Sequence, residues 1–108
     1  MTYLYHDLGA QRQGSTAVIR WHGSGADVLL LDPVNFSKYR RGQHPVAYSG
    51  GGQYRRAPAS LSIPEDGRWY VVADLRGTSA RAAATVEVRH GDDGDRGASP
   101  EEALVSVE

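Results

Sequence analysis

Short apolar segments that alternate with polar residues are the feature that most constrains the fold of this chain. The clearest of them, residues 15–22, places Ala17, Ile19 and Trp21 on one face, as a half-buried strand does. Similar segments recur about every eight to twelve residues, between turn-forming residues. We therefore expect an all-β fold, a small antiparallel β-sandwich of about six to eight strands with one short helix. The other expected strands are residues 3–6 at a sheet edge, 28–31 in a sheet centre, 46–48, 59–63, 69–74 and 83–89.

Glycine and proline mark the connections between these strands. Residues 23–25 (Gly-Ser-Gly) predict a hairpin turn, because glycine tolerates positive φ. Residues 64–67 (Pro-Glu-Asp-Gly) fit a type I turn, which predicts a hairpin between residues 59–63 and 69–74. The glycine run at residues 49–53 would lose much conformational entropy in regular structure, so we expect a loop there.

One segment has helical rather than strand character. Asp32 is placed as an N-cap, Pro33 occupies the first helical position, and Gly42 would end the helix about two turns later. A helix this short, near residues 35–41, is stable only when it packs on the sheet.

Size and composition indicate one globular domain. The 108 residues suit a single small core, and 40% hydrophobic with 23% charged residues is ordinary for a folded protein. Cysteine is absent, which excludes disulfides and thiol chemistry. No apolar run approaches the roughly 20 residues of a membrane span, and residues 1–7 lack the pattern of a signal peptide. We expect a soluble, cytoplasmic protein without a membrane partner.

Charge divides the chain into a basic body and an acidic tail. Residues 1–89 hold eleven Lys or Arg and seven Asp or Glu, a balance of +4, whereas residues 90–108 hold one and six, a balance of −5. We expect a single β-sandwich domain at 1–89 and an acidic, flexible tail at 90–108, disordered at least to residue 98. Ser99 and Glu102 form a capping box that predicts a helix start. That segment would dock on the body or on a partner, or belong to a linker.

An ordered series of motifs covers roughly residues 4–88. It consists of Leu8-Gly9, Gly14, Val28…Leu30…Asp32, Asn35…Tyr39…Gly42, Tyr48…Gly50-Gly51, Pro58…Ile63-Pro64 and Gly67…Trp69-Tyr70-Val71…Asp74. The series resembles the bacterial domain of unknown function family 1883. This resemblance implies a small bacterial domain without an assigned activity, joined in some relatives to a TIR-type domain. It thereby implies a sensing or docking partner of an effector protein, and it supplies no catalytic residues.

Catalytic and metal-binding patterns are missing from the sequence. The four histidines lack a second ligand at i, i+2 or i, i+4 spacing, and no serine lies in a G-x-S-x-G motif. Asp32 and Asp74 are the only acidic pair to consider for hydrolysis, and each is more simply a cap or turn residue. We therefore expect no enzyme activity, no metal and no cofactor.

Cations and tyrosines concentrate between residues 35 and 56. The cations are Lys38, Arg40, Arg41, Arg55 and Arg56, and the tyrosines are Tyr39, Tyr48 and Tyr54. Where the fold brings them together, the cations would bind phosphate and the tyrosines would offer stacking faces for a base or a sugar. The predicted ligand-binding residues are Asn35, Tyr39, Arg40, Arg41, Tyr48, Gly51 and Arg55. The alternative is a solvated basic rim that protects an edge strand from pairing.

These observations favour a non-enzymatic small-molecule binding or sensor module with a phosphate-bearing or nucleotide-derived ligand. One alternative is a self-associating adaptor without a ligand, which would form a homo-oligomer through exposed aromatic side chains. Another is a carbohydrate-binding module, because Trp69 and Tyr70 follow a turn as in many sandwich modules, although Trp21 and Trp69 are better assigned to the core. A body charge of +4 is low for a nucleic-acid partner, which is therefore not expected.

Overall fold

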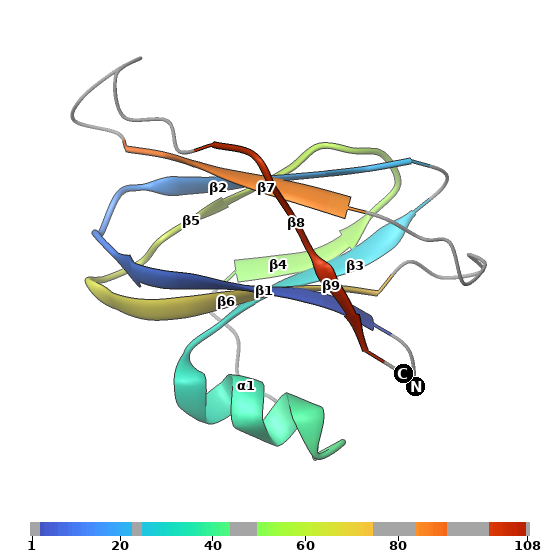
Figure 1. Cartoon of the computed structure of the whole chain (residues 1–108), viewed down its shortest axis with the longest axis horizontal. Coiled ribbons are helices and arrows are strands. Elements are labelled where there is room, and N and C mark those ends of the chain that lie inside the picture. The colour runs from blue at the N-terminus through green and yellow to red at the C-terminus, as the bar shows by residue number, and fades with distance from the viewer. Residues whose placement is uncertain (1–2, 23–24, 44–49, 75–83, 91–99, 108) are drawn as a thin grey trace.

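Two antiparallel β-sheets pack face to face, and one helix covers the outer face of the larger sheet (Figure 1). The computed structural model describes residues 3–22, 25–43, 50–74, 84–90 and 100–107. Within these ranges it confirms the all-β sandwich with one short helix that the sequence predicts.

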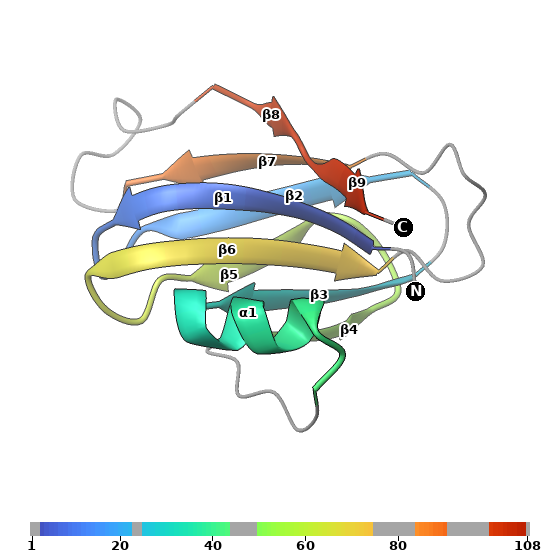
Figure 2. The same ribbon diagram turned by 60° about the horizontal axis from the view of Figure 1, so that its bottom comes forward.

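The strands are hydrogen-bonded in the orders β4-β3-β6-β1-β9 and β5-β2-β7-β8. The first sheet, sheet A, contains β1 (Tyr3–Gln11), β3 (Ala26–Leu31), β4 (Gly50–Tyr54), β6 (Gly67–Asp74) and β9 (Val105–Val107). Sheet B contains β2 (Thr16–Trp21), β5 (Ala59–Ser62), β7 (Ala84–Arg89) and β8 (Glu102–Ala103). The helix, α1 (Pro33–Arg40), lies on the side of sheet A that faces away from sheet B (Figures 1 and 2).

Alternate side chains of both sheets fill the space between them. On β2 these are Ala17, Ile19 and Trp21, and all three are buried, as the alternation predicts. Trp69 of β6 is buried as well, and its Nε1 donates a hydrogen bond to the carbonyl oxygen of Glu65 at 3.0 Å. Both tryptophans therefore belong to the core, and neither forms an exposed platform for a sugar.

The two predicted hairpins are wrong, because the strands that they would join lie in different sheets. β2 pairs with β5 and β7 in sheet B, whereas β3 pairs with β4 and β6 in sheet A. Gly23 and Ser24, two of the three residues of the first predicted turn, fall outside the described residues. Residues 64–67 lead from β5 in sheet B to β6 in sheet A. Turn-forming residues favour a bend in the chain, but a bend does not determine whether the next strand pairs with the last one or crosses to the other sheet.

The glycine run forms a strand rather than the predicted loop. Gly51 and Gly52 of β4 lie opposite Leu29 and Val28 of β3, at the edge of sheet A. Backbone hydrogen bonds to β3 offset the entropy that glycine loses when it is ordered. The strand predicted at residues 46–48 falls outside the described residues.

The first strand is longer than predicted and does not form a sheet edge. β1 continues to Gln11 and lies between β6 and β9. Its pairing with β6 shifts by one residue between Asp7 and Gly9, which is a β-bulge. Gly9 has a φ of 69°, in the left-handed region that favours glycine.

The end of the chain forms strands instead of the predicted helix. Residues 102–103 form β8, which pairs with β7, and residues 105–107 form β9, which pairs with β1. The capping-box pattern is local, and the open edges of β1 and β7 offer this segment backbone partners that a short isolated helix lacks. Ser99 lies outside the described residues, as does the predicted disordered stretch apart from His90.

Helix α1 confirms both predicted ends. The Asp32 carboxylate accepts hydrogen bonds from the backbone N–H of Asn35 at 2.8 Å and from its Nδ2 at 3.0 Å. At the other end, the N–H of Gly42 donates to the carbonyl of Tyr39 and the N–H of Gln43 to that of Lys38, both at 3.0 Å. These two bonds form a Schellman motif, and Gly42 supplies its left-handed residue with a φ of 71°.

We predict that Asp32→Ala lowers the free energy of unfolding by about 1 kcal/mol, because it removes the acceptor that caps α1. Urea denaturation followed by circular dichroism measures this change. Asp32→Asn is the matched control and should lose much less stability, since asparagine is an equally good N-cap. Equal losses in the two variants would show that the cap does not stabilise the helix.

Candidate functional site

The outer face of sheet A carries a cluster of aromatic rings beneath and beside α1. Period-two alternation directs Tyr3, Tyr5 and Asp7 of β1 away from the core, and Tyr70 of β6 lies opposite Asp7. Phe36 is the buried residue of the helix and packs on this face. Tyr3, Leu31, Phe36 and Val72 form the buried centre of the cluster, with Tyr5, Leu29, Tyr39 and Tyr70 around them.

The rings of this cluster contact one another and two arginines. Phe36 stacks on Tyr70 with ring centroids 4.2 Å apart and planes 8° apart, and Tyr5 lies 5.3 Å from Phe36. The guanidinium of Arg40 lies 5.6 Å from the centroid of Phe36, and that of Arg68 lies 5.8 Å from Tyr70. These are cation–π distances, so each guanidinium is attracted to the ring that it contacts.

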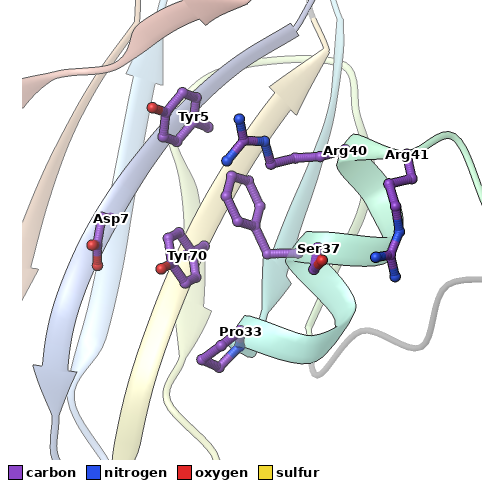
Figure 3. A pocket seen from close by; sticks show the side chains of 8 residues that line it. Tyr5, Asp7, Pro33, Ser37, Arg40, Arg41 and Tyr70 are labelled. Carbon is purple, nitrogen blue, oxygen red and sulfur yellow. The ribbon is translucent and has the colours of Figure 1, made fainter.

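A groove of about 640 Å³ opens between α1 and β1 over these rings. Its lining residues are Tyr5, Asp7, Pro33, Phe36, Ser37, Arg40, Arg41 and Tyr70. In Figure 3 the helix supplies one wall and β1 the other, with Tyr70 of β6 between them. A ligand here would meet aromatic rings along the floor and cations at the C-terminal end of the helix.

Within the described part of the chain, some of the charged side chains in and around the groove have a partner of opposite charge and others do not. Asp7 is held by Arg68, which contacts both carboxylate oxygens, and by the backbone N–H of Gly9 at 2.8 Å. The Arg68 hydrogen bond, reinforced by that of Gly9, lowers the pKa of Asp7 from its usual 3.8. Among the described residues, neither Arg40 nor Arg41 has a carboxylate partner. These two cations are therefore available to an anionic ligand.

The structure brings together only part of the predicted site. Arg40 and Arg41 line the groove. Tyr39 packs edge-on against Tyr3, with centroids 5.0 Å apart, and Asn35 is bonded to the helix cap. Of the other predicted residues, Gly51 and Arg55 do not line the groove. Gly51 lies on β4 and Arg55 follows it, beyond β3 from the groove, and Tyr48 falls outside the described residues.

The predicted convergence of five cations does not occur at this groove. Lys38, Arg55 and Arg56 are exposed and do not line it. Tyr54 packs against the core between the sheets rather than beside Tyr39. Segments 35–41 and 50–56 are close in sequence, but β3 separates β4 from the strands that carry the groove.

Sequence reasoning missed the strand side of the site. Tyr5, Asp7, Arg68 and Tyr70 come from two segments about 60 residues apart, and they meet because β1 pairs with β6. The available signal was alternation, which places Tyr3, Tyr5 and Asp7 on one face. That signal could not identify β6 as the neighbouring strand.

The three described histidines, His6, His22 and His90, do not gather into a site. His6 Nε2 lies 2.6 Å from a carboxylate oxygen of Glu102, His90 Nδ1 lies 3.4 Å from Ser15 Oγ, and His22 is exposed. His44 falls outside the described residues. Within the described ranges, no group of three or more His, Asp or Glu is arranged to hold a metal ion.

No helix in the described part of the chain has the length and apolar character that crossing a membrane requires.

Comparison with known sequences identifies one family. The sequence model of the domain of unknown function DUF1883 matches residues 1–92. No curated protein and no solved structure matches the chain.

Tyr39 should titrate at unusually high pH. Burial, followed by the negative charge of Asp74, raises its pKa from 10.0 to about 12. Because the unfolded chain loses this proton near pH 10, the neutral phenol stabilises the fold below that pH. This contribution is lost as the pH rises towards 12. We predict that stability falls less steeply between these pH values in Tyr39→Phe than in the wild type. Urea denaturation at several alkaline pH values measures the difference, and parallel curves would contradict it.

The Asp7 carboxyl should titrate below 3.8, and Arg68→Ala should raise its pKa because the main hydrogen-bond donor is lost. A lowered carboxyl pKa stabilises the fold above pH 3.8, and this contribution disappears as the pH falls through the folded value. NMR titration of the side-chain carboxyl measures both pKa values. Arg56→Ala, at an exposed arginine away from the groove, is the control and should leave the Asp7 titration unchanged.

Proposed function

This chain belongs to the DUF1883 family, to which no activity is attached, and we propose that it is a non-enzymatic binding module for small phosphate-bearing molecules. The observation that carries the proposal is the groove between α1 and β1, where Arg40 and Arg41 stand beside the rings of Tyr5 and Tyr70.

The lining of the groove suits an anion that carries a planar group. Guanidinium groups match the geometry of phosphate oxygens and can bind them in a bidentate way. Tyr5 and Tyr70 are only partly buried, so the exposed parts of their rings could contact a base or a sugar. The volume of about 640 Å³ falls within the range of known small-molecule sites, which is roughly 300–1,000 Å³.

The polar side chains that line the groove favour binding over catalysis. Ser37 lines the groove, but no histidine is found among the described lining residues, and the Asp7 carboxylate is held by Arg68. A serine nucleophile needs a base within hydrogen-bond reach, and Ser37 is not provided with one in this part of the structure.

A sensing role in the cytoplasm extends the same proposal. Nucleotides and their derivatives are available there, and ligand binding beside α1 could be passed to an effector such as a TIR-domain protein. The outer face of sheet A and α1 would then carry both the ligand and the effector contact.

We predict that the protein binds phosphate-bearing ligands and that Arg40→Ala/Arg41→Ala weakens this binding by at least about ten-fold, because two charge-assisted contacts are lost. Isothermal titration calorimetry with nucleoside mono-, di- and triphosphates, inorganic phosphate and neutral sugars measures the effect. Arg55→Ala/Arg56→Ala is the matched control and should bind as the wild type does. Both variants should keep their melting temperature, since exposed charges contribute little to stability.

Three outcomes would oppose the proposal. Equal weakening in both double variants would indicate a diffuse basic surface rather than this groove. Binding of neutral sugars that is insensitive to Arg40 and Arg41 would favour a carbohydrate-binding module. A defined oligomer in light scattering, with no ligand from the panel bound, would favour the self-associating adaptor.

A further inference from the structure

The C-terminal segment, residues 100–107, joins the two sheets across one side of the sandwich. Its strand β8 extends sheet B next to β7, and its strand β9 extends sheet A next to β1 (Figures 1 and 2). The paired residues are Thr85 with Ala103 and Val86 with Glu102, then Tyr5 with Val105, Leu4 with Ser106 and Tyr3 with Val107. The edges of β1 and β7, with the side chains between them, therefore form an acceptor surface for an extended segment.

Leu104 anchors the segment in the core. It lies between β8 and β9, is 8% exposed and belongs to the cluster of buried residues between the sheets. Its backbone N–H donates a hydrogen bond to the carbonyl oxygen of Ala84 at 2.9 Å. The acceptor surface thus provides an apolar notch and a backbone acceptor for an aliphatic residue.

Two acidic residues before Leu104 contact a histidine and an arginine on the acceptor surface. A carboxylate oxygen of Glu102 lies 2.6 Å from Nε2 of His6. His6 is on β1, opposite Val71 of β6, so its side chain points towards the inside of the sandwich. Glu101 lies 3.5 Å from Arg20, which is also bonded to Glu87 at 2.7 Å. The surface therefore accepts two consecutive acidic residues and an aliphatic side chain two positions after the second of them.

The segment is held by few contacts. β8 has two residues and β9 three, and the side chains of Glu101 and Glu102 remain 50% and 58% exposed. Exposed ion pairs contribute little, and short terminal strands open more readily than the central ones. The acceptor strands β1 and β7 lie within the residues that match the family, whereas this segment lies beyond them.

A second cavity, of about 430 Å³, lies next to the acceptor surface beside Glu101, the first of the two acidic residues. It is lined by Arg20, Trp21, His22, Ala57, Pro58, Ala84, Thr85 and Glu101. An apolar side chain placed just before the acid pair would contact Trp21 and Pro58 there. An occupant with such a residue would therefore add an apolar contact to the backbone ladder and to the contacts of the two acidic side chains.

We propose that the edges of β1 and β7 form a strand-docking surface for an extended segment of a partner protein. The partner segment carries an apolar residue, two acids and then alternating aliphatic residues. When no partner is bound, the chain's own residues 100–107 occupy this surface. This is recognition by strand addition, in which backbone bonds supply affinity and side-chain notches supply specificity. The inference is independent of the groove beside α1 and of any ligand bound there.

The first test uses the full chain with its own segment weakened by Glu101→Lys, Glu102→Lys and Leu104→Asp. A fluorescent peptide of residues 100–107 should bind this variant at least about ten-fold more tightly than the wild type, because the tethered competitor is gone. Replacing Pro100 of the peptide by leucine should tighten binding further. A control peptide with Leu104→Asp should not bind. A folded variant that binds the peptide no better than the wild type would overturn the proposal.

A second measurement, on the wild type, covers the case in which the variant does not fold. By hydrogen exchange the Leu104 amide should be released at least about 100-fold faster than the Val71 amide, because the segment opens without global unfolding. Equal rates would overturn the proposal, since a partner could then enter only by unfolding the domain. A dimer in which two copies exchange this segment would also overturn it, by making a second copy the occupant.

Discussion

Sheet A is apolar on both of its faces, so each face must be covered by another part of the chain. This requirement determines the arrangement of the rest of the structure. On β6, Trp69, Val71 and Ala73 face sheet B, while Val72 faces the other way and is equally buried. Leu31 at the end of β3 is buried on that outer face too. Apolar area left in water costs about 25 cal/mol per Å², so the outer face cannot remain bare. Helix α1, which packs Phe36 against it, is the cover that the chain supplies.

The candidate site is a consequence of how small that cover is. An eight-residue helix buries Phe36 but leaves Tyr5 and Tyr70 half-buried at its margin. Polar and charged groups can be tolerated at such a margin, and Asp7, Arg40, Arg41 and Arg68 gather there. The same partial burial raises the pKa of Tyr39. Aromatic surface, two arginines without a carboxylate partner among the described residues, and a groove thus occur together, because the apolar face is wider than the helix that covers it.

The other exposed side of the sandwich is closed by different means. Residues 100–107 cover β1 and β7, which would otherwise be edge strands, and contribute one buried leucine, a few ladder residues and the contacts of two acidic side chains with His6 and Arg20. The helix end of the domain is held by a cap, a Schellman motif and aromatic stacking, whereas this side is held by two short strands and by acidic side chains that are half exposed. The fold therefore combines a groove beside a capped helix with a sheet edge that is covered by two short strands, and the proposed ligand and the proposed partner would bind at separate places.

The sequence alone determined what is local. Alternation identified several of the strands and the inward face of β2, and Asp32, Pro33 and Gly42 marked the two ends of the helix. It also brought Arg40 and Arg41 into the predicted site. Only the tertiary structure decided which strands pair. It placed β2 and β3, and β5 and β6, in different sheets, ordered the glycine run on β3, and brought β1 beside β6 so that Tyr5, Asp7 and Tyr70 face the helix. Periodicity reports the faces of one strand, whereas pairing depends on contacts between distant segments, and no single stretch of sequence encodes these.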